Sequence, residues 1–195
     1  MNKLMGFFEL QSMNLPAIPW KEYTGKEKLE DDILWTIRSA VFEGNDLNLP
    51  RLVGVNSKEA ETFAGQILKE LEGKGIVIFY PYFIANKSGT LEVNQDRIVI
   101  EAVKSDLWNM VTFSDRDVTI QYKEKKEFVN GNAGFLETKE KEELLSTVRE
   151  IKKTFRGDLI EGKSVLLEWS FAQNCDLNKN PIGDEYLVFY EVRTI

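Results

Sequence analysis

The sequence predicts an α+β protein, with a mostly antiparallel sheet and helices packed on one side of it. Short apolar runs follow one another between residues 76 and 122 at the spacing of a β-meander. Two other segments, residues 57–71 and 138–155, repeat apolar side chains with the helical period. Two more strand-like runs end the chain, so we expect a sheet of roughly six strands.

Composition is typical of a compact protein and excludes several classes of function. With 195 residues, of which 43% are hydrophobic, the chain can form one sizeable domain or two small lobes that share a core. The net charge of −7 argues against binding to nucleic acid, and the apolar runs are too short to span a membrane. Histidine is absent, which excludes a His-based catalytic triad, and the single cysteine, Cys175, is typical of a protein in the reducing cytoplasm.

The first 75 residues are expected to form an N-terminal portion of this unit. It includes an extended segment, because each proline in Leu15–Trp20 disfavours helix at the residue before it. We then expect a short helix at residues 26–32, a strand at 33–41 and a loop at 43–51, where turn-forming residues cluster.

A longer helix follows, and the sequence marks both its start and its end. Asn56 has the form of an N-cap, and Glu59 three residues later completes a capping box. Gly73 ends the segment. The apolar side chains of this segment recur on one helical face: Ala60, Phe63, Ala64, Ile67, Leu68 and Leu71.

Residues 76–195 are expected to form a sheet subdomain, which makes one compact unit with the N-terminal portion. Lys87–Gly89 should form a turn after the first strand, and residues 123–134 an exposed loop. A second helix should begin at Thr138 and end at Gly157. The strands expected before that helix are residues 76–84, 90–93, 97–103, 107–113 and 117–122.

Charged residues interrupt the two strand-like runs that end the chain. Glu168 lies in the first run, and Glu191 and Arg193 should share one face of the second run with Leu187 and Phe189. A desolvated charge is unfavourable unless it is paired or binds a metal. These strands therefore indicate either an internal ion-pair cluster or a nucleotide–metal site.

Six short motifs occur between residue 33 and the end of the chain in an order that is typical of one enzyme family. They are Ile37-Arg38-Ser39, Asp46-Leu-Asn-Leu-Pro50, Tyr80-Pro-Tyr82-Phe83 with the following Ser88-Gly89, Ile100-Glu101-Ala102, Leu167-Glu168-Trp169 and Glu191-Val-Arg193-Thr194. Because its motifs follow this order, the chain resembles the nucleotide-binding domain of phosphoenolpyruvate synthase, pyruvate phosphate dikinase and rifampicin phosphotransferase. The resemblance implies an ATP-grasp-like fold with ATP and Mg²⁺ as its cofactors.

The same resemblance implies which residues bind the nucleotide. Arg38 would hold the phosphates, since a guanidinium group matches phosphate oxygens bidentately. Tyr80, Tyr82 and Phe83 would belong to the segment that meets the adenine, and Glu101 would lie near the ribose or the phosphates. The alternative for Arg38 is a structural ion pair with a carboxylate of a neighbouring strand.

The charged residues of the two terminal strands would complete the site that the resemblance implies. Glu168 and Glu191 would bind Mg²⁺, a hard ion that prefers oxygen ligands and phosphate partners. Arg193 would be catalytic, because it would stabilise the charge on the transferred phosphoryl group.

Two of the departures from the family affect parts that contact phosphate. Bulky residues, Ser105–Trp108, replace its glycine-rich loop, and the N-terminal region with its phosphate-binding lysine is short. That lysine has no marked equivalent among Lys21, Lys26 and Lys28. Three functions therefore stay open: a domain that binds ATP and transfers phosphate to an unknown small acceptor, a non-catalytic interaction or regulatory module, and one subunit of a split enzyme with a protein partner.

Overall fold

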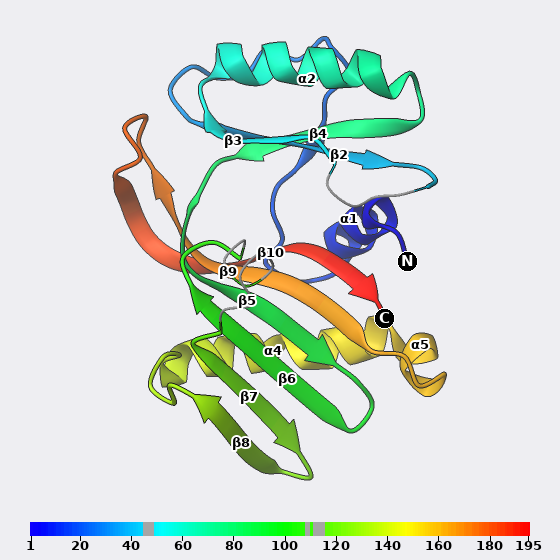
Figure 1. Ribbon diagram of the computed structural model, residues 1–195, viewed down its shortest axis with the longest axis vertical. Helices are drawn as coiled ribbons and strands as arrows, with labels where there is room; N and C mark the ends of the chain where they lie inside the picture. Colours follow the sequence, from blue (N-terminus) through cyan, green and yellow to red (C-terminus); the bar gives the residue numbers. More distant parts are fainter. Residues whose placement is uncertain (45–48, 108–109, 111–115) are drawn as a thin grey trace.

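The structure, a computed structural model, describes residues 1–44, 49–107, 110 and 116–195. It contains two antiparallel sheets, each with helix along one face (Figure 1). The smaller sheet has the strand order β1-β4-β2-β3, and the larger sheet has the order β10-β9-β5-β6-β7-β8. The predicted α+β class is confirmed, but the strands are divided between two sheets instead of forming one.

The smaller sheet carries α2 (Ser57–Leu71) on one face (Figure 1). Asn56 caps this helix as predicted, because its side chain accepts a hydrogen bond from the backbone N–H of Glu59. The apolar face of α2 packs on a cluster that includes Ile37 and Phe79 of the sheet. The strands are β1 (Lys21–Glu22), β2 (Trp35–Val41), β3 (Arg51–Val55) and β4 (Gly75–Pro81).

The larger sheet carries α4 (Thr138–Thr154) and α5 (Arg156–Ile160). Leu144 and Ile151 of α4 are fully buried in the main core together with Trp169 of the sheet. The strands are β5 (Ile84–Val93), β6 (Arg97–Lys104), β7 (Val118–Lys123), β8 (Lys126–Gly131), β9 (Val165–Cys175) and β10 (Pro181–Thr194). None of the described helices combines the length and the apolar character that crossing a membrane requires.

Helix α1 (Lys3–Ser12), which the sequence analysis did not predict, packs against both sheets (Figure 1). Phe7 is fully buried in a cluster that takes side chains from both sheets, including Val188 of β10. Gly6 makes this close approach possible, because a Cβ at that position would lie 2.1 Å from the backbone oxygen of Val192. The helix therefore joins the two sheets and holds its first residue, Lys3, near both.

The predicted turn at Lys87–Gly89 is wrong, because these residues lie inside the long strand β5. Ser88 is buried, and its hydroxyl is 2.8 Å from that of Ser170 on the neighbouring strand. Gly89 does not serve a turn here. A Cβ at Gly89 would collide with the backbone oxygen of Glu101 and would lie 2.5 Å from the ring of Trp169, so this strand glycine permits both close contacts.

Other local predictions differ for reasons of tertiary structure. Residues 26–32 form no helix, and the backbone N–H of Leu29 donates instead to the carboxylate of Glu61 in α2. The segment 123–134, predicted as an exposed loop, includes the edge strand β8. Strand β3 was not predicted at all.

Some predictions stay untested. Most of the strand expected at 107–113, and most of the motif at 46–50, lie outside the described residues. The division of the chain into residues 1–75 and 76–195 also stays a prediction; in the structure β4, which begins at Gly75, pairs with β2 of the smaller sheet.

Gly6→Ala should destabilise the protein, because α1 must move away from β10 to accommodate a Cβ. We expect the free energy of unfolding to fall by about 1–3 kcal/mol. Gly65→Ala is the control: beyond its own helix, a Cβ there meets nothing within 4 Å, so alanine should raise the free energy of unfolding by about 0.5–1 kcal/mol. Chemical denaturation measures both changes, and equal changes would contradict the close packing of α1.

Candidate functional site

A cavity of about 640 Å³ lies between the two sheets. Its walls come from β2, β3 and β4 of the smaller sheet, from β5, β9 and β10 of the larger sheet, and from the start of α1. Every residue that the sequence analysis assigned to a site lines this cavity except Glu101. The predicted residues that line it are Arg38, Tyr80, Tyr82, Phe83, Glu168, Glu191 and Arg193.

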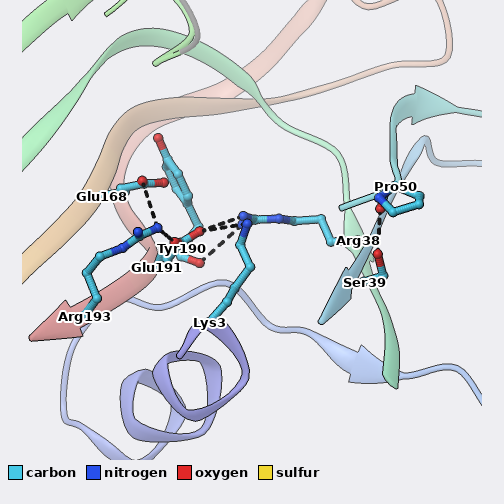
Figure 2. A network of polar contacts seen from close by, with 8 residues as sticks. All are labelled: Lys3, Arg38, Ser39, Pro50, Glu168, Tyr190, Glu191 and Arg193. Atoms are coloured by element: carbon cyan, nitrogen blue, oxygen red, sulfur yellow. Dashed lines mark hydrogen bonds and ion pairs between the residues drawn. The ribbon is translucent and has the colours of Figure 1, made fainter. Parts of the chain in front are cut away.

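Five charged side chains meet in this cavity, and we call them the charged cluster: Lys3, Arg38, Glu168, Glu191 and Arg193 (Figure 2). Arg38 Nη2 lies 2.8 Å from Glu191 Oε2, and Lys3 Nζ lies 3.6 Å from the same oxygen. Arg193 Nη2 contacts Glu191 Oε1 and lies 4.0 Å from Glu168 Oε1. The cluster therefore holds three cations and two carboxylates.

A β-bulge in β10 turns Glu191 into the cavity. The register of β10 on β9 moves from the pair Phe189–Trp169 to the pair Glu191–Glu168, which skips Tyr190. Tyr190 and Glu191 therefore both line the cavity, whereas Phe189 is buried in the main core. The prediction that Glu191 shares a face with Phe189 is wrong, because strict alternation does not hold across the bulge.

The surroundings of the cluster change the acidity of its groups. Burial, and then the charge on Glu191, raises the pKa of Glu168 to about 7. Burial also opposes the ionisation of Glu191, but the charges on Arg38, Lys3 and Arg193 outweigh it and lower the pKa of Glu191. Burial and the charge on Arg38 lower the pKa of Lys3. Near neutral pH the cluster has a surplus of positive charge.

Aromatic side chains form the wall of the cavity where the chain passes from one sheet to the other. Tyr82 and Phe83 connect β4 to β5, and both are half-buried. The ring centroid of Phe83 lies 6.4 Å from that of Tyr80 and 6.4 Å from that of Tyr190. Lys179, in the hairpin between β9 and β10, has its Nζ 5.5 Å from the ring centroid of Tyr82. This wall offers apolar ring faces close to cationic groups.

Glu101 does not join the other predicted residues. It lies on β6, where it forms an ion pair with Arg116 and accepts a 3.4 Å hydrogen bond from Thr90 Oγ1. The strand order explains its position, because β6 lies on the far side of β5 from β9 and β10.

Two cations in the cavity were missed by the sequence analysis, Lys3 of α1 and Arg51 at the start of β3. Within the described residues, the cavity is not lined by the lysines considered earlier, Lys21, Lys26 and Lys28. A signal for Lys3 was present: Asn2 precedes an apolar repeat at helical spacing, and its side chain accepts a hydrogen bond from the N–H of Met5 as an N-cap.

Comparisons with known proteins find a likeness of structure only. No protein-family model matches the sequence, and no curated protein matches it. The structure is similar to D-alanine–D-alanine ligase from Helicobacter pylori, with a TM-score of 0.51 and 9% identity, over 98% of this chain and 50% of that one. For D-alanine–D-alanine ligase from Bacillus anthracis the TM-score is 0.52 and the identity 12%, over 100% of this chain and 56% of that one. The chain has an ATP-grasp-like fold. It spans about half the length of these ligases.

The donor set in this ATP-grasp-like cavity does not fit a magnesium ion. Mg²⁺ needs near-octahedral oxygen ligands at about 2.0–2.1 Å. Arg193 lies between Glu168 and Glu191, and Glu191 is also bound by Lys3 and Arg38. Among the described residues there is no group of three or more acidic, histidine or cysteine side chains that could hold a metal ion. The assignment of both carboxylates to Mg²⁺ stays a prediction that this geometry does not support.

Glu168→Gln should change how stability depends on pH. The pKa of Glu168 is about 7 in the folded protein and ordinarily 4.5, so unfolding releases a proton between these values. The free energy of unfolding of the wild type should therefore fall as the pH rises through this range. The Glu168→Gln variant should not show this fall, because glutamine does not titrate. We expect the variant to gain up to about 3 kcal/mol on the wild type between pH ~4.5 and pH ~7.5 in denaturant titrations. A difference that does not vary with pH would contradict the raised pKa.

Proposed function

We propose that the cavity binds a nucleotide such as ATP between the two sheets. The observation that carries this proposal is one cavity, in an ATP-grasp-like fold, with an aromatic wall beside a charged cluster of surplus positive charge. Its volume of about 640 Å³ lies within the range of small-molecule sites. The base would lie against Tyr82 and Phe83, and the phosphates would point toward Arg38 and Arg193.

Arg38 is the main phosphate ligand in this proposal. Its guanidinium is buried, and it lies 5.2 Å from the ring centroid of Phe7, which limits its conformations. A guanidinium has five N–H donors in a fixed plane, so Arg38 can keep its bond to Glu191 and donate to phosphate oxygens as well.

The catalytic form of this proposal is transfer of a phosphoryl group from ATP to a small acceptor. It rests on the order of motifs shared with the phosphoenolpyruvate synthase family. Arg193, whose side chain is 35% exposed, would stabilise the charge on the transferred group.

A second candidate function is a non-catalytic module that acts by binding a protein partner. Glu191 favours the non-catalytic part of this alternative, because this carboxylate is only 2% exposed and is already bound by Lys3, Arg38 and Arg193. A buried carboxylate with several cationic partners is also what a structural ion-pair cluster contains.

Calorimetric titration of ATP tests the proposal. Wild type should bind ATP saturably, and Arg38→Lys should bind it about ten- to a hundredfold more weakly, because the bidentate hydrogen bonds are lost and the charge is kept. Arg97→Lys is the matched control, since Arg97 pairs with Glu92 at 2.9 Å and does not line the cavity. If wild type shows neither heat nor thermal stabilisation at millimolar ATP, nucleotide binding is rejected and the second candidate gains.

Phe83→Leu should distinguish binding of the base from binding of the phosphates. Loss of stacking on the base should weaken ATP binding about fivefold or more, while binding of tripolyphosphate, which has no base, should not change. Phe128→Leu is the control, because Phe128 is 55% exposed on the edge strand β8. Equal weakening of both ligands by Phe83→Leu would mean that the base does not lie against this ring.

A further inference from the structure

Arg193 lies between the two carboxylates that the sequence analysis assigned to Mg²⁺ (Figure 2). Glu168 and Glu191 are opposite each other on β9 and β10, and Arg193 lies two residues further along β10. Its Nη2 contacts Glu191 and lies 4.0 Å from Glu168 Oε1. The guanidinium therefore takes the space that a metal ion shared by the two carboxylates would need.

We propose that Arg193 replaces a divalent metal ion in this cavity, so that the phosphates of the nucleotide bind directly to side-chain cations without Mg²⁺. The inference rests on the proposed nucleotide site and deepens it, because it specifies a metal-free di- or triphosphate as the form of the ligand.

The charge distribution supports this inference. Glu191 is bound by three cations: it contacts Arg193, and it lies 2.8 Å from Arg38 and 3.6 Å from Lys3. A divalent ion added between the carboxylates would be repelled by Lys3, Arg38 and Arg193 together. The same three cations would attract the phosphate chain of a nucleotide.

The exposure of the cluster also favours contact between Arg193 and a ligand. The side chain of Arg193 is 35% exposed, whereas that of Glu191 is 2% exposed. The cation therefore borders the open cavity, and the carboxylate beneath it fixes its direction. A guanidinium held in this way presents N–H donors in a rigid plane, which suits phosphate oxygens.

The first experiment compares ATP binding to wild type in EDTA and in excess Mg²⁺ by calorimetry. We expect the affinity in EDTA to equal or exceed the affinity with Mg²⁺. An affinity at least tenfold lower in EDTA would overturn the inference, because the phosphates would then depend on the metal. Absence of binding in both buffers rejects the proposed nucleotide site, and the second experiment then decides the role of Arg193 by itself.

The second experiment measures binding of Mn²⁺ to the nucleotide-free protein by electron paramagnetic resonance. Wild type and Arg193→Lys, which keeps the positive charge, should bind no Mn²⁺ at the cluster. Arg193→Gln should gain one Mn²⁺ site, because it removes the cation at Glu191 Oε1 and Glu168 Oε1 and supplies an amide oxygen beside them, whereas Lys3 and Arg38 contact Glu191 at Oε2. The gained site should disappear when Glu168→Gln is added.

Either of two results in the second experiment would overturn the inference. One is a Mn²⁺ site in wild type that is lost in Glu168→Gln, since the carboxylates would then bind metal with Arg193 in place. The other is a folded Arg193→Gln protein, checked by circular dichroism, that gains no Mn²⁺ site. If Arg193→Gln does not fold, wild type and Glu168→Gln still decide through the first of these results.

Discussion

The ion pair between Arg38 and Glu191 joins the two sheets, and the cavity between them depends on it. Arg38 comes from β2 and Glu191 from β10, 153 positions later, and both side chains are buried. Removal of Glu191 would leave the buried guanidinium of Arg38 without its carboxylate partner, which is far more unfavourable than the loss of an exposed ion pair. The pair therefore holds the walls of the cavity together and fixes the N–H donors of Arg38 before any ligand arrives.

Local sequence patterns predicted the elements that depend on neighbours in the chain. Helix α2 followed from Asn56 and an apolar stripe, and β9 from the strand-like run that contains Glu168. The division into two sheets was not predictable in this way, because it depends on contacts between distant segments. The approach of Gly6 to Val192 is one such contact. The approach of Gly89 to the indole of Trp169 is another, although a glycine at this position is typical of a turn.

Seven of the eight residues that the sequence analysis assigned to a site line one cavity, because the strands that carry them converge there. The failures have distinct physical causes. Glu101 lies one strand too far away, and Lys3 enters the cavity only because its helix folds back onto β10. Glu191 was predicted on the wrong face, since alternation alone cannot anticipate the bulge at Tyr190. The roles of these residues toward a nucleotide stay predictions.

In the proposed nucleotide site, the charged cluster must stabilise the fold and leave donors for an anion, and these demands oppose each other. Each carboxylate that holds a cation in place also competes with a phosphate for its N–H groups. Glu191 cannot give up Arg38, because the two are 2.8 Å apart and a buried charge would be left without its partner. Glu168 is 19% exposed and lies 4.0 Å from Arg193, so that contact is looser. In the proposed site, a phosphate would therefore replace the interaction of Glu168 with Arg193 while the ion pair that joins the sheets stays intact.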